Sequence, residues 1–510
     1  MGIRALAGKA LILVENLSVP FDRRVWQECL ALRDAGWQVH VICPQGTKRD
    51  VEPYAEIEGV RIHRYPLRAA VGGPLGYLRE YGTALWHTYR LARKVGPVDV
   101  VHACNPPDLF FLVARRLKRR GARFIFDQHD LVPELYLSRF ARGEDLLYRA
   151  VCWLEQRTYR AADVVIATNE SYREAALTRG GKRPEEVFVV RSAPTVERFR
   201  EVPPDSSIRH GKPYLLSYLG VMGPQDGVDY ALRALAKLRD ERTDWHAVFV
   251  GGGDTFDAMV ALTTELGLSD RVEFTGRISD EDLLRYLSTA DVCLSPDPRN
   301  PLNDVSTMNK IMEYMAMARP IVSFDLKEAR VSAGDAAVYA PANDESHFAK
   351  LIARLLDDPD ERRRMGEIGR ARVAGPLSWD NSRTALLAAY ATAMGATPSV
   401  PRQRGAADHV TTPPVPSLAS QRDAGAGVAS PRVTTTAAYP RQRSVESQNG
   451  QVAPAVQRTD PAASHQSGEV TERQPALGGG PAELGELPVA AADPHPPVQV
   501  GGDSPGRSDQ

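Results

Sequence analysis

Two successive series of strand and helix patterns constrain the fold of this chain more than any other feature. In the first series, apolar runs such as 38–44 (QVHVICP) and 98–104 (VDVVHAC) alternate with helical patterns up to about residue 200. The series starts again at 214–220 (YLLSYLG) and continues beyond 320–325 (PIVSFD). These runs lack strict polar–apolar alternation, which is typical of strands covered by helices on both faces. The sequence therefore predicts an α/β fold with two doubly wound, Rossmann-like domains facing a cleft.

Composition marks where we expect the domains to end. Residues 397–510 consist largely of Pro, Gly, Ala, Ser, Thr and Gln, and Tyr439 is their only Phe, Trp or Tyr residue. Such a segment buries too little apolar surface to offset its ordering entropy, so we predict a disordered tail. We assign 1–200 to an N-terminal domain and 201–377 to a C-terminal domain. Residues 378–396 are expected to form a closing helix that returns toward the N-terminal domain.

Charge and cysteine usage exclude several classes of protein. The net charge of −1 gives no electrostatic basis for binding nucleic acid. The five cysteines are scattered through apolar segments without a CxxC pair, which argues against a disulfide framework or a zinc site. No apolar run approaches the length of about 18 residues that a membrane span needs, and the N-terminus lacks a signal-peptide pattern. We therefore expect a cytoplasmic protein without a metal.

The segment from Ser306 to Arg319 lies between two strand patterns and is expected to be a crossover helix, with Ser306 or Thr307 as its N-cap. Five apolar residues would face the sheet: Met308, Ile311, Met312, Met315 and Ala318. The polar residues Ser306, Asn309, Lys310 and Glu313 would share the opposite face. Because the helix N-terminus attracts phosphate, we expect Glu313 to accept ribose hydroxyls and Lys310 to lie near a diphosphate. A simple solvated face remains the alternative.

Seven further segments carry a more specific pattern. Five lie in the second series and two in the first: YLGVMGPQDGVDYALRAL (218–235), VFVGGGD (248–254), RVEFTGRIS (271–279), LLRYLSTADVCLSPD (283–297), NKIMEYMAMARPIVSFD (309–325), LSVPFDRRVWQECLALRDAGWQVHVICP (17–44) and DQHDLVPE (127–134). In their order and spacing they resemble the GT-B glycosyltransferases of the large family 4 group of retaining enzymes. The resemblance covers about residues 10–394.

The resemblance implies an activity. The C-terminal domain would bind a UDP- or GDP-linked sugar, and the N-terminal domain would bind a saccharide or lipid-linked acceptor in polysaccharide or glycolipid synthesis. The family's reaction retains the anomeric configuration and needs neither a metal nor another cofactor. The leaving diphosphate would itself deprotonate the acceptor hydroxyl, so the protein would position the reactants and stabilise charge.

The resemblance also implies site residues. Glu313 matches the second glutamate of the family's E-x7-E motif, which binds the donor ribose. His129 matches a histidine close to the transferred sugar, so both residues are candidates for the catalytic centre. The donor site would further contain Gly220, Gly223, Gly276, Arg277, Asn309 and Lys310.

Three positions depart from the family pattern. Val305 stands in place of the first glutamate, and Val221 and Asp226 stand in place of the arginine and lysine that neutralise the diphosphate. Candidates for replacement cations are Lys310, Arg277 and Arg299. If nothing replaces the missing cations, donor binding is weakened, so a catalytically silent GT-B scaffold or binding subunit remains open. A sugar-nucleotide epimerase of the same fold is a further alternative.

Two basic segments of the first domain suit an acceptor. Asp22, Arg23 and Arg24 lie at the first strand-to-helix turn, where they would bind an acceptor or merely cap a helix. The helix end ARRLKRRGAR (114–123) suits peripheral contact with anionic lipids at the inner face of a membrane. A solvated helix end explains the same residues equally well.

Overall fold

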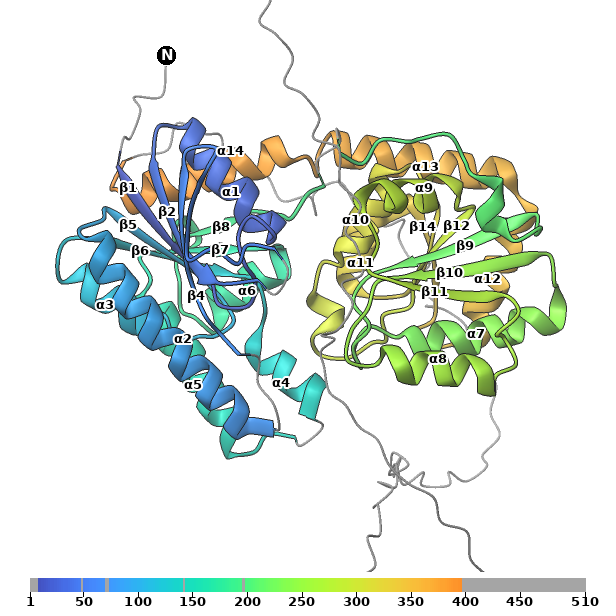
Figure 1. The fold of residues 1–510 in the computed structure, drawn as a ribbon, viewed down its shortest axis with the longest axis horizontal. Helices are drawn as coiled ribbons and strands as arrows, with labels where there is room; N and C mark the ends of the chain where they lie inside the picture. Colours follow the sequence, from blue (N-terminus) through green and yellow to red (C-terminus); the bar gives the residue numbers. More distant parts are fainter. Residues whose placement is uncertain (1–7, 47–48, 69–72, 141–142, 195–197, 397–510) are drawn as a thin grey trace, which may run out of the picture. The chain divides into compact units, whose positions relative to one another are not determined.

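The computed structural model describes residues 8–46, 49–68, 73–140, 143–194 and 198–396 (Figure 1). Within these residues the chain forms two α/β domains, each built on its own sheet, which confirms the predicted fold class. The predicted disordered tail, 397–510, lies outside the described residues. None of the helices in the described part of the chain is both long and apolar enough to cross a membrane.

The N-terminal domain contains an eight-stranded sheet in the order β3-β4-β2-β1-β5-β6-β7-β8. Its strands are β1 (Lys9–Leu13), β2 (Gln38–Pro44), β3 (Tyr54–Ile57), β4 (Val60–Tyr65), β5 (Val100–Cys104), β6 (Arg123–Gln128), β7 (Val164–Ala167) and β8 (Val187–Val189). Neighbouring strands are parallel except for the β3–β4 pair. The strand order reverses between β1 and β5, which makes their carboxyl ends the expected ligand edge.

Helices cover both faces of this sheet (Figure 1). They are α1 (Arg23–Asp34), α2 (Gly73–Val95), α3 (Phe111–Lys118), α4 (Val132–Phe140), α5 (Leu146–Ala161), α6 (Glu170–Thr178) and the short η1 (Pro184–Glu186). The final helix, α14 (Trp379–Ala393), packs on β6, β7 and β8. Its residues Leu386 and Ala389 belong to the same apolar core as Val25 and Leu32 of α1. Thus α1 and α14 cover one face together.

The C-terminal domain contains a six-stranded parallel sheet in the order β11-β10-β9-β12-β13-β14. Its strands are β9 (Tyr214–Leu219), β10 (Trp245–Val250), β11 (Val272–Gly276), β12 (Val292–Ser295), β13 (Ile321–Phe324) and β14 (Ala337–Ala340). The helices are η2 (Ser206–Arg209), α7 (Val228–Glu241), α8 (Phe256–Glu265), α9 (Asp280–Thr289), η3 (Asn303–Val305), α10 (Asn309–Ala316), α11 (Lys327–Ala333), η4 (Gly334–Ala336), α12 (Glu345–Asp357) and α13 (Pro359–Ala374). The order reverses between β9 and β12, so ligands are expected there.

The structure corrects the predicted crossover helix. The helix α10 begins at Asn309, with Met308 rather than Ser306 or Thr307 as its N-cap. The hydroxyl of Ser306 instead donates to the Leu302 carbonyl at 2.8 Å. The Thr307 hydroxyl accepts a hydrogen bond of 3.1 Å from Asn169. Both hydroxyls therefore have partners outside the helix, which a local capping rule cannot reveal.

Candidate functional site

The tyrosine of α10 fixes this helix at the point where β9 and β12 separate. The two strands pair only at Leu216 with Val292 and at Ser217 with Cys293. Beyond that point the buried Tyr314 hydroxyl accepts from the Leu219 main-chain N–H at 2.7 Å and donates to the Leu294 carbonyl at 3.1 Å. These bonds satisfy backbone groups that the parting strands leave unpaired, and they hold α10 at the topological switch point.

A tight glycine turn follows β9 at this edge. A Cβ atom on Gly251 would lie 1.9 Å from the Gly220 carbonyl oxygen, and one on Gly253 would lie 2.6 Å from that of Met222. Only glycine therefore allows the backbone after β10 to support the turn at this distance. The Gly223 N–H donates to the Asp226 carboxylate at 2.9 Å. Asp226 stands where the family pattern has a lysine, and its carboxylate stabilises the turn through this hydrogen bond.

Lys310 lies beneath this turn and is buried, with 7% of its side chain exposed. For Lys310, the alternative of a simple solvated face is therefore wrong. Its ammonium group is 2.6 Å from the buried Asp297 carboxylate and 5.0 Å from the centre of the Tyr218 ring. A buried ammonium needs a counter-charge, and Asp297 supplies it, so Lys310 can be buried although helical periodicity places it among polar residues. The proximity of Lys310 to a diphosphate stays a prediction.

Glu313 lies on α10 with 20% of its side chain exposed. Burial raises the pKa of Glu313 to about 7, although Arg23 and Arg198 oppose the shift. Arg23 is its partner from α1, with Arg23 Nη1 3.8 Å from Glu313 Oε1. Arg23 also pairs with Asp280 at 3.2 Å, and Arg198 pairs with the same aspartate at 2.5 Å. Arg198 and Asp280 are two polar residues of this edge that the sequence analysis missed.

The remaining predicted donor residues lie near the same edge. Gly276 ends β11 with φ of +65°, and its carbonyl accepts from the Gly251 N–H at 2.9 Å. Arg277 is exposed, and its guanidinium carbon lies 5.1 Å from the centre of the Phe21 ring. Asn309 is exposed at the first position of α10. Donor binding by these residues stays a prediction.

Arg299, a candidate replacement cation, has partners within its own domain. Its Nη2 donates to the Asp325 carbonyl at 2.7 Å, and its Nε lies 3.4 Å from Asp304. With half of its side chain exposed, it keeps donor capacity toward solvent. These contacts do not test whether it neutralises a diphosphate, so this role stays a prediction.

His129 directly follows β6 at the carboxyl edge of the N-terminal sheet. Its Nε2 lies 2.6 Å from Asp127 Oδ2, and its main-chain N–H donates to Asn105 at 2.7 Å. A carboxylate only accepts, so Nε2 carries a proton toward Asp127, and in the neutral ring Nδ1 is then the acceptor. Arg24 Nε lies 3.1 Å from the same Nε2 atom. Burial disfavours the imidazolium, but the Asp127 carboxylate outweighs burial and raises the pKa of His129.

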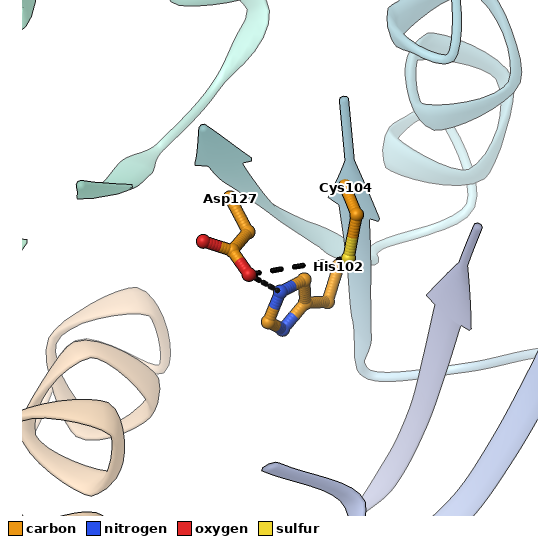
Figure 2. Close-up of side chains that lie close together, drawn as sticks. All are labelled: His102, Cys104 and Asp127. Atoms are coloured by element: carbon orange, nitrogen blue, oxygen red, sulfur yellow. Dashed lines mark hydrogen bonds and ion pairs between the residues drawn. The ribbon is translucent and has the colours of Figure 1, made fainter. Parts of the chain in front are cut away.

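Asp127 is the centre of a buried polar network that the sequence analysis did not single out. His102 Nε2 and Cys104 Sγ, both from β5, lie 3.3 Å and 3.9 Å from Asp127 Oδ2 (Figure 2). Arg24 Nη2 lies 3.0 Å from Asp127 Oδ1. Although burial opposes it, Arg24 and His129 hold the pKa of Asp127 well below its usual range. The aspartate is thus ionised and orients His129.

The trio in Figure 2 does not fit a metal ion, despite its ligand types. Arg24 places a fixed positive charge on Asp127, and a second cation would be repelled. Burial raises the pKa of the Cys104 thiol well above its usual value, so the thiolate that a metal prefers is disfavoured. We interpret the trio as a support for His129.

The three residues predicted to bind the acceptor have different environments. Asp22 caps α1, accepting from the Val25 N–H at 3.1 Å. Arg24 is nearly buried, and its Nη1 donates to the Val190 carbonyl at 2.8 Å. Arg23 is open to solvent, with 53% of its side chain exposed. Acceptor binding by these residues stays a prediction, and Arg23 has the most accessible side chain of the three.

The chain matches known protein families along both domains. Residues 22–193 match the model of a glycosyl transferase 4-like domain, and residues 213–358 match that of the glycosyl transferases group 1. Alpha-D-kanosaminyltransferase of Streptomyces kanamyceticus is 24% identical over 366 residues, which cover 68% of this chain and 92% of that protein.

Solved structures show the same fold. Sucrose-phosphate synthase from Thermosynechococcus elongatus has a TM-score of 0.63 and 22% identity, covering 76% of this chain and 99% of that one. Anabaena HepE, in complex with UDP-glucose, has a TM-score of 0.56 and 15% identity, covering 76% of this chain and 100% of that one. At these identities the likeness concerns the arrangement of the two sheets and their helices.

Proposed function

The chain belongs to the GT-B glycosyltransferases of the group 1, family 4 type, and on this premise we propose retaining transfer from a UDP- or GDP-linked sugar to a saccharide or lipid-linked acceptor. The observation that carries the proposal is the place of Glu313. It lies on α10, which Tyr314 anchors between β9 and β12. A carboxylate there accepts two ribose hydroxyls, as the E-x7-E motif of the family implies.

The diphosphate of the donor would lie along the glycine turn and the start of α10. Met308 makes no capping hydrogen bond with its side chain within the described chain, and the Ile311 N–H donates to the Met308 carbonyl at 3.1 Å. The N–H groups of Asn309 and Lys310 would therefore be the ones that face phosphate oxygens. Lys310 and Arg277 would add positive charge, replacing the cations lost at Val221 and Asp226. HepE binds UDP-glucose in the same fold, which favours a uridine nucleotide as the first donor to test.

In the proposed reaction, the bond between the sugar C1 and the diphosphate oxygen breaks while C1 bonds to the acceptor oxygen on the same face. The acceptor proton moves to the departing diphosphate. His129 Nδ1, freed by the Asp127 contact of Nε2, would accept a hydrogen bond from a sugar hydroxyl and hold the ring in place. The helix N-terminus and the cations would stabilise the leaving group without a metal.

Donor turnover by the purified protein tests this function. We expect release of UDP from UDP-glucose, or of GDP from GDP-mannose, with one donor clearly preferred and the rate unchanged by EDTA. Transfer to a simple alkyl glycoside should give the anomer of the donor, measured by proton NMR. Absence of both turnover and nucleotide binding would favour the silent scaffold, and an epimerised free sugar would favour the epimerase.

We also propose a peripheral membrane surface on the outer side of α2, α3 and α5, which lie side by side in Figure 1. The large apolar side chains exposed on these helices include Trp86 at 56%, Leu112 at 46% and Trp153 at 51%. Exposed basic residues surround them: Arg90, Arg93, Lys94, Arg115, Arg116, Arg119 and Arg120. Tryptophan beside arginine suits the headgroup region of an anionic membrane, which would present a lipid-linked acceptor.

Sedimentation with vesicles tests this surface. The protein is expected to bind phosphatidylglycerol-containing vesicles and to be released by salt. Arg116→Glu and Arg120→Glu should each weaken binding about fivefold or more, because one basic side chain near an anionic surface contributes about 1 kcal/mol. Arg363→Glu, an equally exposed substitution on α13, should have little effect. Equal binding to neutral vesicles, or equal loss with Arg363→Glu, would contradict the proposal.

A further inference from the structure

Three potential metal ligands meet at the edge of the C-terminal sheet opposite the glycine turn. His246 is the second residue of β10, and Glu273 is the second residue of β11. Both therefore lie at the amino ends of parallel strands, whereas the glycine turn follows the carboxyl end of β9. His210 follows η2 on the segment that enters the domain. The cluster is thus separate from the proposed donor site.

The distances within the cluster suit a small cation. His210 Nε2 lies 3.2 Å from Glu273 Oε2, and His246 Nε2 lies 3.9 Å from the same oxygen. One ligand atom from each residue falls within 4.8 Å of the other two. Tetrahedral zinc with bonds of about 2.0–2.1 Å separates its ligand atoms by about 3.3 Å. Small side-chain movements would therefore close the set around an ion.

His246 is the member of this cluster whose ring nitrogens lack a hydrogen bond within the described chain. Its side chain is buried, with 5% of the residue exposed, and neither ring nitrogen has a hydrogen-bond partner within the described chain. Burial and the neighbouring His210 lower the pKa of His246 to about 4, so its imidazole is neutral near pH 7. An ion pair between His210 and Glu273 accounts for those two residues and leaves the lone pair of His246 unused.

The surroundings hold the ligands in place. The Tyr286 hydroxyl donates to Glu273 Oε1 at 3.2 Å, which leaves Oε2 directed at the histidines. Carboxylates that bind metals typically accept a hydrogen bond of this kind from a neighbouring side chain, which fixes their orientation. His210 follows Arg209, whose guanidinium lies 2.6 Å from Asp291 and fixes the segment on the sheet.

We propose that His210, His246 and Glu273 form a site for a divalent transition metal of the zinc type, with water completing its shell. Two imidazoles and one carboxylate are a ligand set that Zn²⁺ accepts readily. The ion would tie the segment that enters the C-terminal domain to β10 and β11. Because the site has only three protein ligands, weaker binding is expected than at a closed four-ligand site.

Cobalt titration of the untagged, full-length protein tests the site after chelator treatment and dialysis. We expect one equivalent of Co²⁺ to bind with visible ligand-field absorption and to be displaced by Zn²⁺. Zinc should also raise the melting temperature, by an amount that grows with the logarithm of its concentration above the dissociation constant, because the ion binds the folded state. Both readouts are independent of glycosyl transfer, so an inactive protein does not affect the result.

Three variants assign the binding to this cluster. His210→Asn removes the imidazole and keeps a residue that tolerates the observed φ of +49°. His246→Leu removes a side chain that has no hydrogen bond to lose. Each should weaken Co²⁺ binding at least about tenfold. His347→Ala, which removes an exposed histidine on α12, should bind like the wild type.

The proposal is overturned if the wild type shows no saturable binding, or if His210→Asn binds Co²⁺ as tightly as the wild type. Binding that His347→Ala weakens equally would indicate an adventitious ion only. Should His246→Leu fail to fold, His210→Asn decides alone, because more than half of the His210 side chain is exposed and its loss leaves the core intact.

Discussion

Asp127→Asn is expected to lower kcat about 10²- to 10³-fold while leaving the KM for the donor near the wild-type value. The aspartate accepts from Arg24 with Oδ1 and from His129 with Oδ2. An asparagine that keeps its oxygen on Arg24 must present its NH₂ group to His129 Nε2. The histidine then shifts its proton to Nδ1, so the atom that faces the substrate changes from an acceptor to a donor.

Paired variants separate this positioning role from a loss of stability. His129→Ala should show a similar fall in kcat, and the double variant should lose little more, because both changes remove one function. Glu28→Gln is the matched structural control: its carboxylate lies 3.2 Å from Arg24 in the same buried network. It should change the urea midpoint more than kcat. A kcat of Asp127→Asn within threefold of the wild type would refute the assignment.

The strands and the two-domain fold were predictable because their signals are local. The expected run 38–44 coincides with β2, since a strand buried on both faces is continuously apolar. The edge strand β3 was missed because its only local signal is the Glu58–Gly59 turn, whose φ values of +48° and +78° are typical of a two-residue hairpin. Glutamate rarely marks such a turn.

The site was less predictable because its charged side chains form ion pairs with residues that lie far away in the sequence. Asp127 and Arg24 are 103 residues apart in sequence, and no spacing rule connects them. Lys310 is paired with Asp297, which lies 13 residues earlier, and no helical or strand period connects the two residues. Glu313 could be singled out because the resemblance supplied its role, whereas its arginine partner comes from the other domain. Long-range ion pairs are therefore what the sequence did not reveal.

Glu313→Gln is expected to weaken nucleotide binding about 10- to 100-fold at pH 8, because hydrogen bonds to a charged acceptor contribute about 1.5–3 kcal/mol. Calorimetric titration of the full-length protein with UDP, GDP and ADP measures this loss and identifies the preferred base. Glu367→Gln, an exposed substitution on α13, serves as the matched control and should bind like the wild type.

The pH dependence of the same titration tests the mechanism of binding. Burial raises the pKa of Glu313 to about 7, so the carboxylate that accepts ribose hydroxyls is dominant above pH 7 and is lost below it. Wild-type affinity should therefore fall about tenfold from pH 8 to pH 6, whereas Glu313→Gln should change only as far as the nucleotide's own phosphate titrates. The ratio of the two affinities isolates the carboxyl group. A ratio independent of pH would mean that Glu313 does not contact the ribose. If Glu313→Gln binds the nucleotide as tightly as the wild type at pH 8, the nucleotide binds elsewhere.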